Sequence, residues 1–569
     1  MAKVYGIDLG TTYSAIATLD ENGMPEVIEN YADSIPLLAS AVYFPSGGEP
    51  VVGKEAKNQA EVEPDRVVQF VKREIGKPDA TERNFDGVNY DPILVSSLIL
   101  KRMKEYADEQ GNDVKDVVIT CPAYFGNEER DATKQAGKIA GLNVLNIVNE
   151  PTAAALNYCV REFKENRKIM VYDLGGGTFD ITLFDFSVDE GGKATIDVIE
   201  TGGNDRLGGI DWDARLYDYI CELYTDENGV SQDEMDAELR QKIRSQVEDV
   251  KKAISNMPSK SFTISYAGDA TRLEVTREKF EERTQDLVEQ TMDFVHQLLQ
   301  TAGISAEQVD VVLLVGGSTK MPMVKAAVEE VFSGKVRVEQ PDLAVAKGAA
   351  LAAAIEFNER LDKRVRGEVD EFVAPVGIGD DEVAEPLPPI TEDEVAALKI
   401  NVPQQVSMVN DKLSRSFGPA VYVDDNSYMI DNLLFVGDDV PSEATGTYGT
   451  MVDNQKAVEF TVFENIDRDR VNKHVMPSID VEGNDQYTDP ALKVKGLGNV
   501  RLELPPGTPK GSPIQVFFRI STIGVEVRAT NVETSESVNA VLAYENNMSQ
   551  EELTQAIKQM ASIRTSGNI

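Results

Sequence analysis

Two short turns in the sequence carry the residue types that bind phosphate and magnesium. In each, an apolar run ends in an aspartate, Asp8 in GIDLGTTYS and Asp173 in VYDLGGGTFDI, and small or hydroxyl residues follow at once. Glycine lets another group approach the backbone closely, and a concave row of N–H groups and hydroxyls can hold phosphate oxygens. Magnesium keeps several waters and needs only one or two carboxylates. The pair of turns therefore predicts a phosphate and Mg²⁺ site.

Each turn also has a simpler interpretation as an ordinary hairpin turn. The usual phosphate loop ends in Gly-Lys-Ser/Thr at the start of a helix, whereas Thr178, Phe179 and Asp180 follow the glycines here and a new apolar run begins. The chain contains no GxxxxGK[ST], which argues against a P-loop ATPase. Phosphoryl transfer at these turns would need positioning, charge neutralisation and a group that orients the attacking water.

A third glycine-containing segment follows an apolar run later in the chain. In VVLLVGGSTKMP (311–322), Gly316 and Gly317 separate that run from a serine and a threonine. Close backbone approach at these glycines predicts a seat for adenosine, and a tight strand-to-helix turn is the alternative. The three segments together favour a nucleotide site.

The elements that must position these turns form a repeated α/β pattern. Short apolar runs alternate with longer helical ones over residues 4–355. The two aspartate turns lie about 165 residues apart, the size of one domain. We therefore predict a duplicated domain whose two lobes face one another, with the ligand held between both turns. Charged amphipathic helices are expected over 233–255 and over 276–303, the second ending at Gly303.

Composition excludes several classes of function. The 569-residue chain has 97 acidic and 56 basic residues and a net charge of −41, so it repels nucleic-acid backbones and anionic membranes. Its two histidines, His296 and His474, argue against a histidine triad or a multi-histidine metal site. Three scattered cysteines without CxxC suit a reducing compartment. With no signal segment and no apolar run of about 18 residues, we expect a cytoplasmic protein.

The pattern changes in the C-terminal half of the chain. Residues 368–394 contain ten acidic and no basic residues together with PLPP, which is typical of an acidic spacer or a partner-binding motif. Later runs such as PIQVFFRIST alternate apolar and polar residues between turn residues, as antiparallel strands with one buried face do. We expect a nucleotide-binding domain over 1–360, an insertion and linker over 361–399, a β domain over 400–548 and one short capped helix over 549–569.

These motifs resemble those of the heat shock protein 70 chaperone family. The resemblance is specific over residues 3–355 and weaker over about 400–555. It implies a two-lobed, actin-like (ribonuclease H-like) α/β ATPase domain that uses ATP or ADP and Mg²⁺, joined to an antiparallel β-sandwich that binds extended hydrophobic peptides. The matching segments are GIDLGTTYS, FVKREIG, VITCPAYFGNEERDATKQAGKIAGL, NEPTAAAL, VYDLGGGTFDI, LGGIDWD, EDVKKAIS, VGGSTKMP and QPDLAVAKGAA.

The resemblance assigns roles residue by residue. Lys72 matches the lysine beside the γ-phosphate, where a cation stabilises the transferring group, and Glu150 and Asp180 match carboxylates that place the water and sense the nucleotide. Pro122 and Arg130 match a switch that couples the two domains. Catalytic roles are implied for Asp8, Lys72, Glu150, Asp173 and Thr178, with Asp8 and Asp173 facing Mg²⁺ mainly through water. Nucleotide binding is implied for Gly10, Thr11, Thr12, Tyr13, Gly175, Gly176, Gly177, Asp180, Gly208, Gly209, Glu248, Lys251, Lys252, Ser255, Gly316, Gly317, Ser318, Lys320 and Asp342.

Several residues depart from the family pattern. Lys252 and Lys320 stand where arginines are usual, and because lysine stacks less well on a ring, we expect lower nucleotide affinity. Ile210 replaces an acidic residue. The linker match EVAALKINVP (394–403) has alanines for two leucines and Lys399 for an acid, so we expect it to dock less strongly on the ATPase domain.

Two classes of function follow from these observations. The first is an ATP-hydrolysing chaperone that cycles on unfolded or extended hydrophobic polypeptides, with partners that could include a J-domain cochaperone and a nucleotide-exchange factor. The second is a nucleotide-controlled binding or scaffold protein without general folding activity. The altered linker, the acidic insertion and the space for only a short helix after Ser549, too little for a full lid, favour the second. A sugar or acetate kinase would leave NEPTAAAL and the β domain unexplained.

Overall fold

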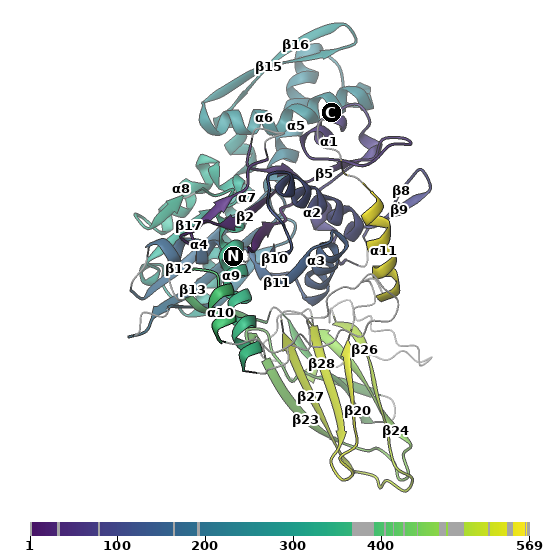
Figure 1. Cartoon of the computed structure of the whole chain (residues 1–569). Helices are drawn as coiled ribbons and strands as arrows, with labels where there is room; N and C mark the ends of the chain where they lie inside the picture. The colour runs from purple at the N-terminus through teal and green to yellow at the C-terminus, as the bar shows by residue number, and fades with distance from the viewer. Residues whose placement is uncertain are drawn as a thin grey trace.

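A computed structural model gives the arrangement of the elements (Figure 1). No helix in its described ranges is long and apolar enough to cross a membrane. The structure describes residues 3–30, 35–77, 80–162, 165–190, 194–338, 340–366, 392–402, 406–413, 415–424, 427–440, 442–465, 474–475, 494–521, 524–542, 550–563 and 565.

Two sheets with the same strand order form the two lobes of the larger domain. The first lobe has the order β11-β10-β1-β2-β3, with β4 beside β2, and the second has β18-β17-β12-β13-β14, extended by β19 and β22. In each lobe the central strand, β1 or β12, pairs antiparallel with the next strand and parallel with its other neighbour. The shared order and direction confirm the predicted duplication.

The strand bounds show how the predicted turns arise. Asp8 is the last residue of β1 and Asp173 the last but one of β12. Four residues separate each of these strands from its antiparallel hairpin partner. The first-lobe strands are β1 Tyr5–Asp8, β2 Tyr13–Leu19, β3 Pro25–Val27, β4 Leu38–Ala39, β10 Asp116–Cys121 and β11 Asn143–Asn149. The second-lobe strands are β12 Arg167–Leu174, β13 Phe179–Val188, β14 Ala194–Asn204, β17 Val311–Val315, β18 Val336–Val338, β19 Val406–Lys412 and β22 Asp439–Val440. Smaller sheets contain β5 Ala41–Tyr43, β6 Val51–Val52 and β7 Val67–Gln69, then β8 Arg83–Phe85 and β9 Val88–Tyr90, then β15 Ser259–Tyr266 and β16 Asp269–Thr276.

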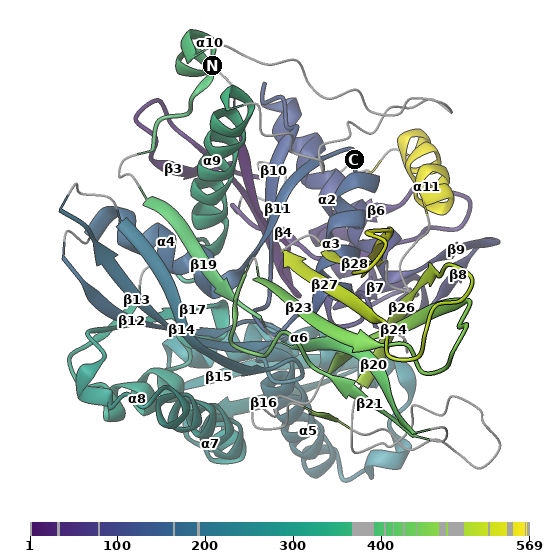
Figure 2. The same cartoon turned by 90° about the horizontal axis from the view of Figure 1, so that it is seen from below.

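Two helices, α4 (Glu150–Glu162) and α9 (Ala344–Val365), pack against each other between the two sheets (Figure 2). Helix α9 lies on β1, β2 and β10, and α4 lies on β12 and β13. They meet closely, since a Cβ on Gly348 would lie 1.7 Å from the carbonyl oxygen of Ala153. The remaining helices of this domain are α1 Lys54–Gln59, α2 Pro92–Glu109, α3 Asn127–Ile139, α5 Gly209–Asn228, α6 Ala237–Asn256, α7 Arg277–Ala302 and α8 Pro322–Val331.

Both charged helices expected from the sequence are present in the second lobe. Helix α6 begins at Ala237, four residues later than expected, because the side chain of Asp236 caps it by accepting from the N–H of Leu239. Helix α7 ends at Gly303, whose φ of 67° is the left-handed conformation of a helix C-cap. The local end signals in the sequence thus set the helix bounds.

A β domain follows β19 and contains two antiparallel sheets that share one hydrophobic core, to which Leu413 also belongs. Strand β27 illustrates the predicted alternation, because Ile514, Val516 and Phe518 are buried and Gln515 is exposed. The sheets have the orders β25-β21-β20-β24-β26 and β23-β27-β28-β29. Their bounds are β20 Ser416–Asp424, β21 Ser427–Asp431, β23 Ser442–Gly449, β24 Ala457–Asn465, β25 His474–Val475, β26 Val494–Glu503, β27 Pro513–Ser521, β28 Gly524–Asn531 and β29 Ser537–Leu542.

The linker lies against the two-lobed domain. After α10 (Glu392–Leu398), the side chain of Asn358 donates to the carbonyl of Ile400 and accepts from its N–H, both at 2.9 Å. Lys399 pairs with Asp362 at 2.8 Å. Strand β19 then pairs parallel with β14 and antiparallel with β22, so the second-lobe sheet continues past the predicted boundary at 400. Most of the acidic segment 368–394 lies outside the described residues.

The expected C-terminal helix is α11 (Gln550–Ser562), and its proposed cap, Ser549, lies outside the described residues. Leu553, Ala556 and Met560 are buried in the core of the first lobe, and α11 contacts α3 (Figure 1). The amine of Lys101 donates to the carbonyl of Met560 at 2.6 Å. The helix therefore extends the core of the two-lobed domain.

Candidate nucleotide site

A cavity of about 430 Å³ lies between the two lobes. Its volume is within the range of small-molecule sites in proteins. Three glycine-containing turns contribute to its walls, from β1–β2, β12–β13 and the segment after β17. The predicted residues that line it are Asp8, Gly10, Thr11, Thr12, Tyr13, Lys72, Glu150, Asp173, Gly175, Gly176, Thr178, Gly209, Glu248, Lys251, Lys252, Ser255, Gly316, Gly317, Ser318, Lys320 and Asp342.

The two aspartate turns are packed directly against one another. A Cβ on Gly176 would lie 2.3 Å from the hydroxyl oxygen of Thr12, and one on Gly177 would lie 2.4 Å from the methyl carbon of Thr11. Gly175 is less confined, since the nearest atom to its Cβ would be 3.6 Å away. The glycines therefore allow the facing turn to approach, in addition to shaping the cavity.

Buried carboxylates surround one lysine at the inner end of the cavity. The amine of Lys72 is buried and pairs with Glu150. Burial alone would lower the pKa of Lys72, but Glu150 and Asp8 outweigh it and raise that pKa. Burial, followed by the charge of Glu150, raises the pKa of Asp8 to about 7 and that of Asp173 well above its usual value. A further cation beside these two aspartates would stabilise their ionised forms and so lower both pKa values.

The outer end of the cavity carries a charged cluster that joins the two lobes. The hydroxyl of Tyr13 donates to Glu248 at 3.0 Å and accepts from Lys57 at 3.0 Å. Lys57 and Lys252 both pair with Glu248, and their amines each lie 5.0 Å from the ring centroid of Tyr13. Burial alone would raise the pKa of Glu248, but the two lysines outweigh it and lower that pKa to about 2.

The family model described as Hsp70 protein matches residues 4–367 of the sequence. The chain belongs to the heat shock protein 70 family. The resemblance found from the motifs is thereby confirmed. Members of this family are chaperone-type ATPases with an actin-like ATPase fold, and they typically bind nucleotide with Mg²⁺. The matched region corresponds to the two-lobed domain with its central cavity.

The residues of this Hsp70 chain fit a magnesium ion held with a nucleotide. Asp8 and Asp173 line the cavity from opposite turns. Within the described ranges, no three acidic, histidine or cysteine side chains are grouped to hold an ion by themselves. Magnesium is commonly held by one or two carboxylates, water and substrate phosphates. The two aspartates are therefore suited to an ion that the phosphates help to bind.

Three residues predicted to bind nucleotide do not line the cavity of the Hsp70 domain. Gly177 and Gly208 pack against each other, since a Cβ on Gly208 would lie 2.5 Å from the carbonyl carbon of Gly177. Asp180 is buried and accepts from the N–H of Ala123 at 2.8 Å, which places it beside Pro122. These residues support the turn instead of forming the cavity wall.

Arg130, the second predicted coupling residue, is connected to the carboxylates at the inner end of the cavity through one intervening residue, Asn149. Its guanidinium donates to the side chain of Asn149 and, at 3.2 Å, to the carbonyl of Phe125. Asn149 directly precedes Glu150, the partner of Lys72. A covalent and hydrogen-bonded connection thus runs from the cavity to helix α3, which carries Arg130.

Sequence reasoning missed several parts of this Hsp70 site. Lys57 lies on the short helix α1, outside any recognised motif, and only the folded structure brings it to Glu248. Asp213 holds Lys251 at 2.8 Å, and its position inside LGGIDWD was an available signal. Ile210, noted only as a departure, lines the cavity. The other unpredicted lining residues are Ile35, Leu37, Asn256, Met321, Pro341 and Val345.

Proposed function

We propose that this chain is an ATP-dependent chaperone of the heat shock protein 70 type, which hydrolyses ATP to control its binding of unfolded hydrophobic polypeptide segments. The observation that carries the proposal is the cavity in which Lys72 and Glu150 meet two opposed aspartate turns. A nucleotide held at both turns would contact both lobes at once. Nucleotide state could then set how the lobes lie relative to each other.

The side chains at the inner end have distinct roles in this proposal. Bound Mg²⁺ would neutralise phosphate charge, with Asp8 and Asp173 as its protein partners through water. Lys72 stabilises negative charge on the transferring group, as fixed cations at such sites do. Glu150 orients the attacking water as a hydrogen-bond acceptor, and the Lys72 amine holds its carboxylate in place. The hydroxyl of Thr178 lies beside the same end of the cavity.

The β domain is the proposed site for polypeptide. Its two antiparallel sheets and shared core correspond to the weaker part of the sequence resemblance. We place the protein in the cytoplasm, with a J-domain cochaperone and a nucleotide-exchange factor as candidate partners. Both assignments rest on the composition and the family.

The ATPase proposal is tested by replacing Lys72. We expect Lys72→Ala to lower the single-turnover rate of ATP hydrolysis with Mg²⁺ by about 10²- to 10³-fold, because it removes a preorganised charge. Lys279→Ala is the matched control, since the side chain of Lys279 is 41% exposed on α7, outside the cavity, and its amine pairs with Glu282. ATP binding, followed by calorimetry, distinguishes lost chemistry from lost affinity. A wild-type protein without ATPase activity would refute the proposal.

Control of polypeptide binding is tested by release kinetics. A labelled hydrophobic peptide bound to the full chain should dissociate faster after ATP is added than after ADP, because the linker contacts the two-lobed domain. The same Lys72→Ala and Lys279→Ala variants serve as the test and its control. Peptide binding with a release rate indifferent to ATP would favour the scaffold function over the chaperone cycle.

A further inference from the structure

A buried charged cluster joins helix α3 of the ATPase domain to the β domain. Arg415 directly precedes β20, and its guanidinium lies 2.9 Å from the carboxylate of Glu464 on β24 and 3.3 Å from that of Glu129 on α3. The two strands are neighbours, since Phe417 pairs with Glu464. Arg415 therefore contacts both domains with one planar group.

The cluster is largely shielded from solvent. The side chain of Glu464 is fully buried, and those of Arg415 and Glu129 are 13% and 12% exposed. Gly126, the residue before α3, forms part of the enclosure, because a Cβ there would lie 2.3 Å from the central carbon of the guanidinium. Gly126 has φ near −75°, which alanine adopts without strain. Glycine is therefore required at position 126 by the space that the Arg415 guanidinium occupies, and not by the backbone conformation.

The contact between the two domains shields the charged groups of the cluster from water. Arg415 pairs with both Glu464 and Glu129, and the charges of Glu129 and Glu128 also act on Glu464. Burial, above all, raises the pKa of Glu464, and the attraction of Arg415 opposes that rise. If the domains separated, water would reach Arg415 and Glu129, and the ion pair between them would be lost. An ion pair that is shielded from solvent contributes more than an exposed one.

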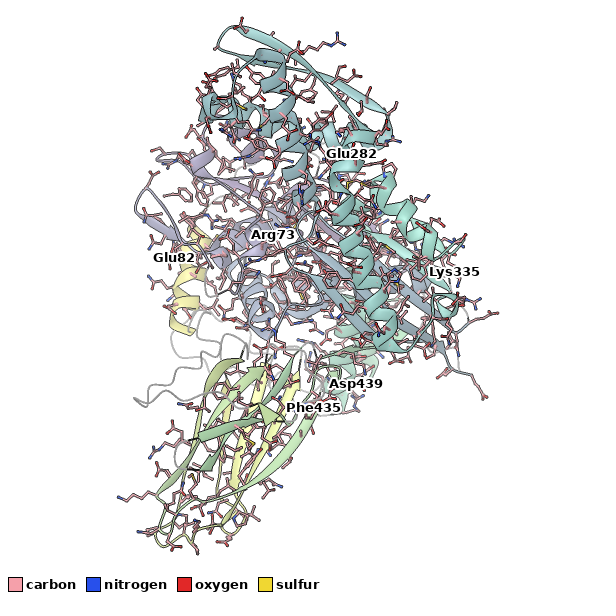
Figure 3. All side chains as sticks on the ribbon, turned by 180° about the vertical axis from the view of Figure 1, so that it is seen from behind. Arg73, Glu82, Glu282, Lys335, Phe435 and Asp439 are labelled. Atoms are coloured by element: carbon pink, nitrogen blue, oxygen red, sulfur yellow. The ribbon has the colours of Figure 1, made fainter. Side chains whose placement is uncertain are left out.

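Helix α3 links this cluster to the nucleotide site. Arg130 follows Glu129 directly and donates to Asn149, which precedes Glu150 at the inner end of the cavity. A displacement of Glu150 or Asn149 would therefore move Arg130 and the adjacent Glu129 on the same helix turn. Glu129 contacts Arg415. Figure 3 shows the β domain adjoining the two-lobed domain, with Phe435 and Asp439 labelled where the two domains meet.

We propose that Arg415 is an interdomain latch, which holds the β domain to the ATPase domain through Glu129 and passes the state of the nucleotide site to β24. The latch deepens the proposed function by naming the contact that regulates polypeptide binding. The nucleotide signal rests on that proposed function, whereas the docking contact is independent of it.

The latch is tested by energy transfer between dyes on the two domains of the full chain. The three native cysteines are buried, so dyes can be placed at Glu330→Cys on α8 and Glu533→Cys in the turn after β28, both exposed. We expect Glu129→Gln and Gly126→Ala each to lower the ratio of docked to undocked molecules on the order of tenfold. Peptide release and ATPase rates are measured on the same variants.

A paired variant separates the latch from the stability of the β domain. Arg415→Gln alone leaves Glu464 buried without its cation, so Arg415→Gln is combined with Glu464→Gln, which keeps the domain free of unpaired charge. We expect this double variant to undock as Glu129→Gln does, with β-domain unfolding unchanged. Arg501→Gln is the control, because Arg501 pairs with Glu459 and Glu503 on the exposed face of the same sheet.

Each outcome has a distinct meaning. If Glu129→Gln and the double variant remain docked like the wild type, or the wild type shows no docked population, the latch is refuted. If the wild type docks through Arg415 but neither hydrolyses ATP nor responds to it, the proposed function fails and the contact stands. If docking falls in the variants and ATP no longer accelerates peptide release, both are supported.

Discussion

At the residue scale, the glycines of DLGGGT have a structural reason beyond phosphate binding. Gly176 and Gly177 lie so close to Thr12 and Thr11 that any side chain on them would push the two lobes apart. Gly175, with 3.6 Å of clearance, has no such constraint. The motif therefore holds the lobes together as well as contributing Gly175 and Gly176 to the wall of the cavity.

The first prediction compares two neighbouring glycines. Gly177→Ala should destabilise the nucleotide-free protein by about 1–3 kcal/mol, because its Cβ overlaps Thr11 and the core of the turn has no spare volume. Gly175→Ala should cost less, since its Cβ meets only ordinary contacts. Thermal unfolding of both variants without nucleotide measures the difference. Equal losses would show that the turns do not pack as described.

At the scale of elements, α1 and α6 close the outer end of the cavity. Lys57 on α1 pairs with Glu248 on α6, and the ring of Tyr13 lies between the lysines. These helices belong to different lobes and are far apart in sequence. The cluster thus contributes to lobe closure before any nucleotide binds.

The second prediction follows from the pKa of Glu248. That pKa is about 2 in the folded protein and about 4.3 in an unfolded chain, so the cluster stabilises the fold above pH 4.3 and loses this effect as the pH falls toward 2. Glu248→Gln should lower the unfolding free energy at pH 7 by up to about 3 kcal/mol. The difference in unfolding free energy between the wild type and Glu248→Gln should become smaller below pH 4.3. A gap independent of pH would contradict the assignment.

The third prediction concerns helix α11, which completes the core of the first lobe. Met560 is 2% exposed there, and Leu553 and Ala556 lie beside it. We expect Met560→Ala to destabilise the ATPase domain by about 2–5 kcal/mol through lost burial and a cavity. Gln555→Ala is the control, since Gln555 is exposed on the same helix. Calorimetric unfolding that left the ATPase transition unchanged in Met560→Ala would place α11 elsewhere in solution.

For the molecule as a whole, two of the contacts among the described residues explain how the β domain is held to the two-lobed domain. One is the linker, where Asn358 holds the backbone of Ile400 and β19 extends the second-lobe sheet. The other is the Arg415 cluster against α3. Lys399, which replaces the usual acid, has a partner in Asp362, so the altered linker retains a docked position.

The fourth prediction concerns how these contacts combine. Asn358→Ala removes both hydrogen bonds to Ile400. It should destabilise the docked state relative to the undocked state by about 1–2 kcal/mol. Because Asn358 and Glu129 lie in different contacts, the effects of Asn358→Ala and Glu129→Gln on docking should add within about 0.5 kcal/mol. Energy transfer in the single and double variants measures this sum. A strongly non-additive result would mean that the linker and α3 move as one unit.

Much of the site was predictable because it lies in continuous motifs. Strand ends, turn glycines and helix caps act over a few residues, so Asp8, Asp173 and Gly303 could be assigned from local sequence. Lys57 and Arg415 could not, because a single charged residue on a short helix or before a strand resembles any surface cation. Their partners lie 191 residues away for Lys57 and 286 residues away for Arg415 and Glu129.

Local spacing and period in the sequence were enough to predict the residue types that line the cavity, the duplicated lobes and the alternating strands of the β domain. Three features came from the folded structure alone: the two turns touch through their glycines, α11 packs on the first lobe, and Arg415 contacts α3. The physical reason is that burial and charge pairing between distant segments depend on which surfaces meet, and a local pattern does not encode that choice.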